Sequence, residues 1–314
     1  MAAFIIRRIL LGILTIWIIT FTVFSFMQLV PGDPVYWRVS QQATQEEIEL
    51  IRHEFWLDRP FIVQYWHWLD RAFHGDFGTS IVNNQKVTDM VAMRVPITLY
   101  LTSMAFVLST IAGIAAGIIC AVRRGGILDS IITLFANIGI ATPVFWLGIL
   151  GIYYLGYKLD WLPLMDYVSP FDNLWESLRH AVMPVMVLAI PNLAGLVRQT
   201  RSSMLEVIQQ DYIRTAWSKG LKERTVILVH ALKNCLIPVI TLMSFFAATL
   251  IAGSVLVEMV FNIPGMGRFV AAGAQNKDFP TVQAGALLIS MIVVTINLVV
   301  DVAYGWVDPR IRYQ

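Results

Sequence analysis

The stretch DYIRTAWSKGLKERTVILVHALKN, residues 211–234, decides how the rest of the chain is interpreted. Its apolar residues recur near helical spacing, which predicts helix, but charged side chains are interleaved with them. Because charges inside a bilayer are costly, this segment is not a membrane span. Gly220 lies near its middle, and a glycine within a helix costs about 1 kcal/mol relative to alanine. We therefore predict a turn at Gly220 between two short helices.

Two kinds of contact suit such a polar helical segment between hydrophobic stretches. The first is a protrusion that inserts into a groove on another protein. The second is an amphipathic helix on the inner leaflet of a membrane, attracted there by its basic residues. Periodicity alone favours the second.

The composition of the whole chain is that of a membrane protein. Of its 314 residues 57% are hydrophobic and only 14% are charged, and the mean hydropathy is +0.66, whereas soluble domains carry about 25% charged residues. The net charge of +2 is too small to indicate binding of nucleic acid. The two cysteines, Cys120 and Cys235, fall near predicted cytosolic ends of spans, so a disulfide framework is not expected.

Six apolar stretches have about the length of a membrane-spanning helix, which takes roughly 20 residues. The first is too long for the apolar part of a signal peptide, about 7–15 residues, and no cleavage site follows it, so we predict a retained helix. The predicted fold class is an all-α polytopic membrane protein with six transmembrane helices. The spans are 9–30, 97–122, 131–157, 181–197, 236–257 and 281–300.

The distribution of Lys and Arg sets the orientation, because these residues are enriched in cytosolic loops. With the N-terminus inside, the cytosolic segments hold thirteen of them and the two short outer loops hold four. Both termini and the stretch at 211–234 are therefore predicted to be cytosolic. The cytosolic segments are 1–8, 123–130, 198–235 and 301–314, and the short outer loops are 158–180 and 258–280.

The outer segment 31–96 has structure of its own. It begins with PGDP, a turn signal, and Thr44 with Glu47 fits a capping box at the start of a helix. Residues 59–80 are dense in aromatic side chains. A small helical subdomain on the outer ends of the spans and a docking surface are both consistent with this pattern.

Polar side chains and prolines inside the predicted spans are candidates for a translocation pathway, since such groups usually face protein or water. Pro143, Pro184 and Pro191 favour irregular helices at membrane depth. Hydrogen bonds between helices are the alternative for each polar residue, worth about 0.6 kcal/mol on average. The candidates are Asn137, Thr142, Pro143, Asn192, Thr241, Ser244, Thr249, Ser254 and Asn297.

Two further features of the spans favour structural roles. Gly113 and Gly117 form a G-x-x-x-G pair, which more often marks close helix packing than a pore. Glu258 and Asp301 lie near opposite ends of their spans, where each can reach headgroup water or a basic partner.

Enzymatic motifs are absent from the sequence. No Gly-Lys pair occurs, so there is no P-loop to cradle phosphates, and no HExxH, CxxC or GxSxG is present. His53, His67 and His74 share the outer segment, but solvent-facing or packing roles are favoured over a weak metal site. We therefore predict that the chain is not an enzyme by itself, has no catalytic residue and binds no metal or cofactor.

The stretch at 211–240 resembles the cytoplasmic signature loop of ABC importer permeases, in the peptide/nickel/opine branch. Ala216 and Gly220 match the general pattern E-A-A-x-x-x-G, while Arg214 and Thr215 replace its first two residues. Further motifs of that branch follow in the same order along the chain. They are FIIRRIL, LVPGDPV, LDRPFIVQYWHWL, HGDFGTS, VRQTRSSMLEV, LVEMVFNIPGMGR, DFPTVQAGAL and DPRIRY. Trp56 departs from the branch, which commonly has glycine there.

The resemblance implies a type I importer permease fold and a coupling helix at 211–221 that docks in a cleft of a cytosolic ATPase. Ala216 and Gly220 would permit close approach, and Arg214, Lys219 and Lys222 would meet polar groups of the ATPase. The implied coupling residues are Tyr212, Arg214, Ala216, Lys219, Gly220 and Leu221. The implied partners are a second similar permease, two ATPase subunits that hold ATP and magnesium, an extracytoplasmic binding protein and membrane lipid, in a bacterial inner membrane.

The expected division of the chain follows from the spans and the resemblance. Residues 1–30 are the N-terminal segment and first span, 31–96 the extracytoplasmic subdomain, 97–307 the permease core with the coupling loop 198–235, and 308–314 the cytosolic tail. The branch handles peptides, nickel chelates, opines and related solutes, and short peptides are the favoured substrate. A stand-alone ion-driven carrier is the alternative of another class, although we find no convincing internal repeat, which many such carriers have.

Overall fold

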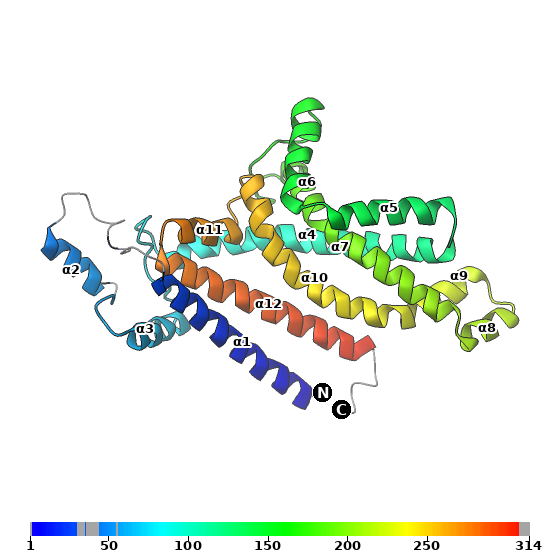
Figure 1. Ribbon diagram of the computed structural model, residues 1–314, viewed down its shortest axis with the longest axis horizontal. Helices are drawn as coiled ribbons and strands as arrows, with labels where there is room; N and C mark the ends of the chain where they lie inside the picture. The colour runs from blue at the N-terminus through cyan, green and yellow to red at the C-terminus, as the bar shows by residue number, and fades with distance from the viewer. Residues whose placement is uncertain (1, 30–34, 36–43, 55, 308–314) are drawn as a thin grey trace. The chain divides into compact units, whose positions relative to one another are not determined.

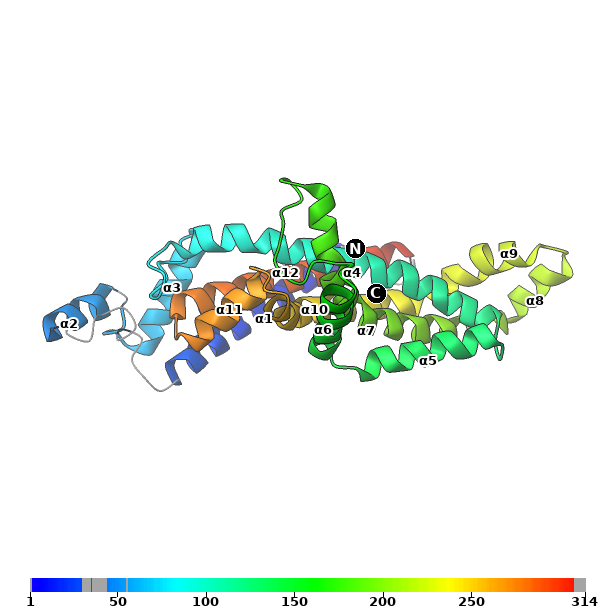
Figure 2. The ribbon, with the colours of Figure 1, turned by 90° about the horizontal axis from the view of Figure 1, so that it is seen from above.

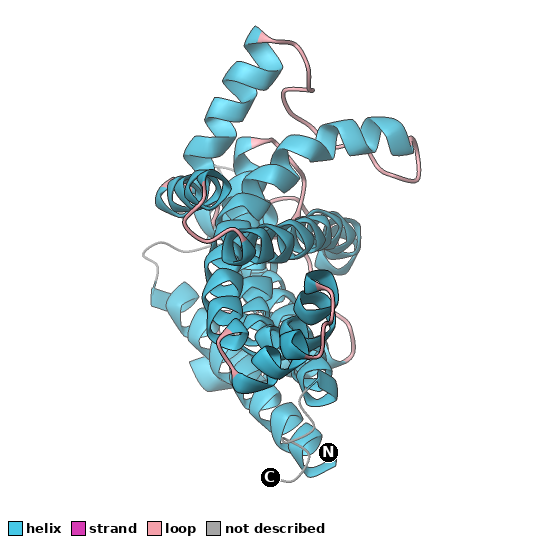
Figure 3. Ribbon diagram, turned by 90° about the vertical axis from the view of Figure 1, so that its right-hand side faces the viewer, coloured by secondary structure: helices cyan, strands magenta, loops and turns pink. Residues whose placement is uncertain are grey.

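The computed structural model describes residues 2–29, 35, 44–54 and 56–307. This part of the chain consists of helices and connecting loops, and it contains no strand beyond an isolated bridge between Thr79 and Lys86. Figure 3 shows this all-helical character. The predicted all-α class is therefore confirmed there. The PGDP turn, the DPRIRY motif and the tail at 308–314 lie outside the described residues.

The described residues contain five helices long and apolar enough to cross a bilayer, or six if one bent pair counts as a single span. That upper count equals the predicted number. The long helices are α1 (Ala2–Leu29), α4 (Val87–Val122), α7 (Leu174–Ile208), α10 (Leu232–Val260) and α12 (Phe279–Val307) (Figure 1).

The bent pair covers the predicted span 131–157. Helix α5 (Ile127–Ala141) ends at Thr142, and α6 (Val144–Gly151) follows at an angle of 106°, continuing into the π-helical segment η2 (Ile152–Lys158). Thr142 has an extended backbone, with ψ 126°, because the ring of Pro143 disfavours the helical conformation in the residue before it. The irregular helix expected at Pro143 is therefore found, as a sharp bend within the predicted span.

Helix α7 is much longer than the predicted span 181–197. It begins at Asn173, whose side chain accepts a hydrogen bond from the backbone N–H of Glu176, and runs unbroken for 35 residues. Pro184 and Pro191 lie inside it without interrupting it, so the expected irregularity at these prolines is not found. Most of the predicted loop 198–235 is consequently helical.

The chain divides into two compact units. The first unit comprises Met1–Ile5, Tyr100–Ile263 and Thr295–Gln314. In it α7 packs against α5 and α10. The G-x-x-x-G pair of α4 lies directly on α7, because a Cβ placed on Gly113 would be 2.7 Å from Cβ of Leu196, and one on Gly117 would be 2.6 Å from Cβ of Thr200. The predicted packing role of both glycines is confirmed.

The second unit comprises Ile6–Leu99 and Pro264–Val294, and includes α2 (Gln45–Glu54), α3 (Phe61–Phe73) and α11 (Met266–Gln275). The capping box is present, since Thr44 N donates to Glu47 Oε2 at 3.0 Å and Glu47 N donates to Thr44 Oγ1 at 3.3 Å. Helix α3 packs on α1 through aromatic contacts of Tyr65 with Phe21 and Phe24. Part of the outer segment is therefore a helical layer on the first helix.

A single carboxylate joins distant parts of the second unit. Asp278 accepts hydrogen bonds from Ser80 Oγ, from Ile81 N at 3.0 Å and from Thr281 Oγ1 at 2.7 Å. The bond to Ser80 joins residues 198 positions apart in the sequence. The loop before α4 is thereby fastened to the start of α12.

Trp56 closes α2 in a conformation that usually requires glycine. Its φ is 59°, in the left-handed region. Trp56 N donates to His53 O at 3.1 Å and Leu57 N donates to Arg52 O at 2.9 Å, the two bonds of a Schellman motif. The indole stacks on the imidazole of His67, with ring centroids 3.7 Å apart and planes 9° apart. The left-handed turn that glycine adopts most readily is thus made here by a tryptophan.

Candidate functional site

The predicted coupling segment folds as a short helix beyond the C-terminal end of α7. Helix α8 (Asp211–Ser218) follows α7 after two residues, and α9 (Glu223–Thr225) and the π-helical segment η3 (Val226–Ala231) lead back into α10 (Figure 2). The backbone N–H of Ile213 donates to the carbonyl of Gln210, the residue before the helix. Asp211 lies in the first turn, where a negative charge interacts favourably with the helix dipole.

The predicted turn at Gly220 is present and has a specific geometry. Gly220 has φ 74°; its N–H donates to Trp217 O at 2.9 Å, and Leu221 N donates to Ala216 O at 3.5 Å. These are the two bonds of a Schellman motif, in which glycine is the favoured residue. A Cβ at Gly220 would meet no atom of this chain within 4 Å. Gly220 is therefore needed for the backbone conformation and not for space within the chain.

One face of α8 belongs to the hydrophobic core of the first unit. Ile213 and Ala216 are buried, in a cluster that also contains Met204 of α7, Val226 of η3 and Cys235 of α10. The expectation that Ala216 lets another protein approach therefore needs correction. Its small side chain is turned toward its own helices, because it shares the buried face of α8 with Ile213.

The residues of α8 beside this buried face, and Leu221 after the turn, are partly exposed and combine apolar with basic side chains. Tyr212 and Trp217 are 43% exposed and Leu221 is 39% exposed. Arg214 and Lys219 are exposed beside them. Sequence reasoning did not select Trp217 as a site residue, and helical spacing gave no signal for it, because with about 3.6 residues per turn Trp217 lies next to Ile213 on the helix.

Hydrogen bonds hold these partly exposed side chains only lightly. The amide of Asn234 donates to the hydroxyl of Tyr212 at 2.7 Å and so ties α8 to α10. Arg214 lies 3.5 Å from Asp211, but both side chains are largely in solvent, and such a pair contributes little, between 0 and about 1 kcal/mol. The guanidinium of Arg214 is consequently available to a partner.

Only two of the candidate pathway residues are brought together. Thr249 of α10 donates to the amide oxygen of buried Asn192 in α7 at 3.5 Å. This contact joins the two most closely packed helices of the first unit, so for this pair a structural hydrogen bond is observed.

The remaining candidates are separated. Thr142 and Thr241 each donate to the carbonyl four residues earlier in their own helices, at 2.7 and 3.3 Å. Ser254 is buried and bonds to Ile251 O. Asn137 and Thr241 are exposed in this chain, whereas Thr142, Ser244 and Asn297 are partly buried and Pro143 forms the bend before α6.

The structure narrows the alternatives for Glu258 and for the three outer histidines. Glu258 is fully buried, so it does not reach headgroup water in this chain. The three outer histidines each have a contact, and none of these contacts is to another histidine. His53 bonds to Asp58 at 3.0 Å, His67 stacks on Trp56, and His74 bonds to the carbonyl of Asp70 at 2.8 Å.

Comparison with known families covers nearly the whole chain. Residues 113–313 match the family described as binding-protein-dependent transport system inner membrane component. Residues 1–102 match the N-terminal part of such membrane components.

Curated relatives match over their full length. The glutathione transport system permease protein GsiC of Escherichia coli (strain K12) is 40% identical over 314 residues, which is 100% of both chains. The probable peptide ABC transporter permease protein y4tP of Sinorhizobium fredii (strain NBRC 101917 / NGR234) is 37% identical over 313 residues, again 100% of both.

A solved structure shares the fold. A chain of the MetNI methionine ABC transporter in an inward-facing conformation superposes with a TM-score of 0.55 at 16% identity, covering 70% of this chain and 96% of that one. At this identity the match concerns the fold alone. Together with the family match and the apolar helices, it identifies a type I permease fold. The chain belongs to the family of binding-protein-dependent transport system inner membrane components, and is a multi-pass permease subunit of an ABC importer in a bacterial inner membrane.

Proposed function

We propose that this chain forms half of the translocation pathway of an importer for short peptides, and that the exposed side chains of α8 dock on an ATPase subunit. An ABC importer permease acts with ATPase and substrate-binding proteins. The finer assembly proposed here has a second homologous permease, two ATPase subunits and one extracytoplasmic binding protein.

The choice of peptides is supported by the relatives that align over their whole length. Their names refer to peptide and glutathione transport. A nickel chelate, an opine or another small solute would use the same arrangement of subunits. The binding protein, a separate chain, would make the selection among them.

The observation that carries the coupling role is the division of α8 into a buried face and partly exposed residues beside it. Tyr212, Trp217 and Leu221 remain partly exposed in this chain, although burying the rest of each would be favourable. Aromatic residues and arginine are enriched among the residues that contribute most to protein interfaces. Arg214 and Lys219 beside them would meet polar or acidic groups around the docking cleft.

The buried face of α8 supplies the route by which movement reaches the spans. Ile213 and Ala216 pack in one cluster with residues of α7, η3 and α10. Because protein cores are close-packed and resist compression, a displacement of α8 moves the adjoining ends of α7 and α10 with it. The closed turn at Gly220 keeps the exposed side chains in register with this core.

The energy source lies on the partner chains in this proposal. The sequence has no P-loop, so ATP and magnesium would be bound by the ATPase subunits. This chain would bind no cofactor and perform no catalysis. Asn137 and Thr241, polar and exposed within their helices, would face the pathway or the second permease, and the other candidates would line it with them.

Reconstitution of the complete transporter in proteoliposomes tests the proposal. Uptake of radiolabelled alanyl-alanine is measured with and without ATP, for the native chain and for Trp217→Ala. Removing an interface aromatic costs about 2 kcal/mol, so the affinity of the ATPase for the permease should fall about thirtyfold, and ATP-dependent uptake should fall with it. Trp175→Ala is the matched control, since Trp175 is also exposed but lies at the other end of α7.

Two results would contradict the proposal. Normal ATP-dependent uptake by a Tyr212→Ala, Trp217→Ala double variant at normal membrane levels would remove the docking role of α8. Uptake that continues without ATP and responds to an ion gradient would indicate a carrier instead of an ATP-driven importer.

A further inference from the structure

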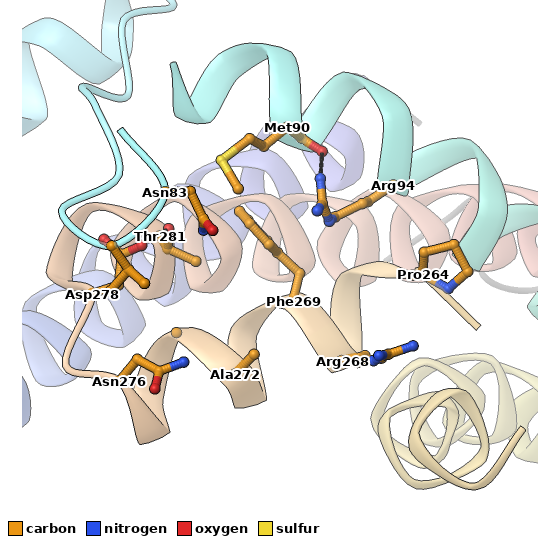
Figure 4. A pocket seen from close by; sticks show the side chains of 13 residues that line it. Asn83, Met90, Arg94, Pro264, Arg268, Phe269, Ala272, Asn276, Asp278 and Thr281 are labelled. Carbon is orange, nitrogen blue, oxygen red and sulfur yellow. Dashed lines mark hydrogen bonds between the residues drawn. The ribbon is translucent and has the colours of Figure 1, made fainter. Parts of the chain in front are cut away.

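A pocket of about 310 Å³ lies between the start of α4 and helix α11 in the second unit. The sequence orientation places it on the outer side, because α4 and α12 both begin there. Figure 4 shows Arg94 extending from α4 on one side and Arg268 from α11 on the other, with Asn276 and Asn83 at the edges. The side chains that line it thus come from four separate parts of the chain.

Hydrogen-bond donors dominate the polar lining. Arg94 is held in place, since its Nη1 donates to Met90 O at 2.7 Å and its guanidinium carbon lies 4.6 Å from the ring centroid of Phe269. That is the one hydrogen bond the Arg94 side chain makes among the described residues, and it uses one of five N–H donors. Arg268 lines the same pocket, so the lining carries two guanidinium groups. A negative group in the pocket would interact favourably with Arg94.

The acid in the pocket wall does not fill this role. Asp278 lines the pocket, but its oxygens accept from Ser80, Ile81 and Thr281. It is therefore engaged in fastening the loop before α4 to the start of α12. The pocket offers donors and positive charge with its one carboxylate already occupied.

We propose that this pocket binds a carboxylate group presented on the outer face. A guanidinium donates two parallel N–H bonds to a carboxylate, and such bonds are shorter and stronger than neutral ones. The volume is at the lower end of the range for ligand pockets, about 300–1,000 Å³, which suits one end of a short molecule. The carboxylate comes either from the C-terminus of a peptide substrate or from an acidic side chain of the binding protein. The first source rests on the proposed function; the pocket itself does not.

The rate at which phenylglyoxal modifies Arg94 measures whether a ligand occupies the pocket. The complete transporter in lipid nanodiscs, without ATP, is treated with phenylglyoxal, and modification of each arginine is followed by mass spectrometry. A saturating concentration of alanyl-alanine should slow labelling of Arg94 about tenfold, by mass action on the free site. Alanyl-alanine amide, which lacks the carboxylate, should not. Arg59, exposed elsewhere in the second unit, is the internal control.

Variants test the site with a second reporter. In Arg94→Gln, the dipeptide concentration that half-protects Arg268 should rise about tenfold, because a charge-assisted bidentate contact is lost. Arg94→Lys keeps the charge without the paired donors and should be intermediate. If a variant fails to assemble, the labelling of the native chain still tests the proposal by itself.

The outcomes separate the sources of the carboxylate. Protection by the free dipeptide supports the peptide C-terminus, and protection only after the binding protein is added supports an acidic side chain of that partner. Equal labelling of Arg94 under all conditions, or equal protection by the amide, overturns the proposal. Because no step requires ATP, these results are independent of the uptake assay that tests the proposed function.

Discussion

Arg201 of α7 and Asp129 of α5 form a bidentate ion pair, with Nε 2.8 Å from Oδ1 and Nη2 2.9 Å from Oδ2. Asp129 is only 5% exposed and also accepts from the backbone N–H of Gly125 at 3.0 Å. The pair thus joins two helices at the end where the sequence places the cytosol. Sequence inspection treated Arg201 as one of the cytosolic charges and gave no hint of its partner.

Removing one member of this pair should be strongly destabilising. Arg201→Met leaves the carboxylate of Asp129 buried without its cation, which costs about 3–5 kcal/mol. Thermal unfolding in detergent would measure the loss, with Arg198→Met as the control at an exposed arginine on the same helix. Adding Asp129→Asn to Arg201→Met should recover part of the stability. If the double variant loses the sum of the two single effects, the residues are not coupled.

Substitutions at Gly220 should follow the tolerance of each residue for positive φ. Alanine there costs about 1–2 kcal/mol in the left-handed conformation, asparagine less and valine more. Melting temperature and ATP-dependent uptake should both fall in the order Asn, Ala, Val. Since a Cβ at this position meets nothing in the chain, an effect that tracked side-chain volume alone would point to contact with a partner instead.

Two glycines in long helices should respond oppositely to alanine. At Gly117 the added Cβ would lie 2.6 Å from Cβ of Thr200 and 2.9 Å from the carbonyl of Val197. Forcing α4 from α7 should cost about 1–3 kcal/mol. At Gly253 the nearest atom is Leu188 Cδ2 at 3.9 Å, so alanine should be neutral or stabilise by up to about 1 kcal/mol. Equal melting temperatures for the two variants would contradict the observed packing.

Trp56 should show the competition between backbone strain and ring stacking. Trp56→Ala removes the stack on His67 and keeps the steric cost of the positive φ, whereas Trp56→Gly removes both the stack and that cost. The alanine variant should therefore be less stable than the glycine variant by about 1 kcal/mol. In a His67→Ala background each variant should lose less, because the stacking partner is already gone. Indistinguishable alanine and glycine variants would argue against the left-handed turn.

Hydropathy predicted the number of long helices but not the residues at which they begin and end. The apolar run of α7 ends near Val197, yet the helix continues to Ile208, because Arg201 finds Asp129 and Met204 finds the core of the first unit. Pro143 indicated an irregular helix, but so did Pro184 and Pro191, and the sequence did not show which of the three prolines bends its span. The residues on both sides of Pro143 are apolar, so the composition of the sequence does not change at the point where the helix axis changes direction.

In the coupling segment, residues 211–221, the sequence likewise predicted the local structure but not the contacts with distant residues. Its charges, its helical spacing and Gly220 predicted the short helix and the turn, since these depend on neighbours in the sequence. Which face would be buried depends on residues of α7, η3 and α10, and Ala216 was consequently assigned to the wrong side. The pocket at Arg94 was not predictable, because it unites residues separated by most of the chain.

The hydrogen bonds accepted by Asp278 have a consequence for the order in which parts of the chain fold during synthesis. The central segment of the first unit, Tyr100–Ile263, is continuous and leaves the ribosome as one piece, whereas the second unit needs Ile6–Leu99 together with Pro264–Val294. Ser80 and Ile81 must therefore wait through synthesis of almost two hundred further residues before their partner exists. Domains generally fold as units during synthesis, at about 5–20 residues per second. For about tens of seconds Ile6–Leu99 is made but lacks the rest of its unit, and Pro264–Val294 completes that unit only after the central segment of the first unit has been made.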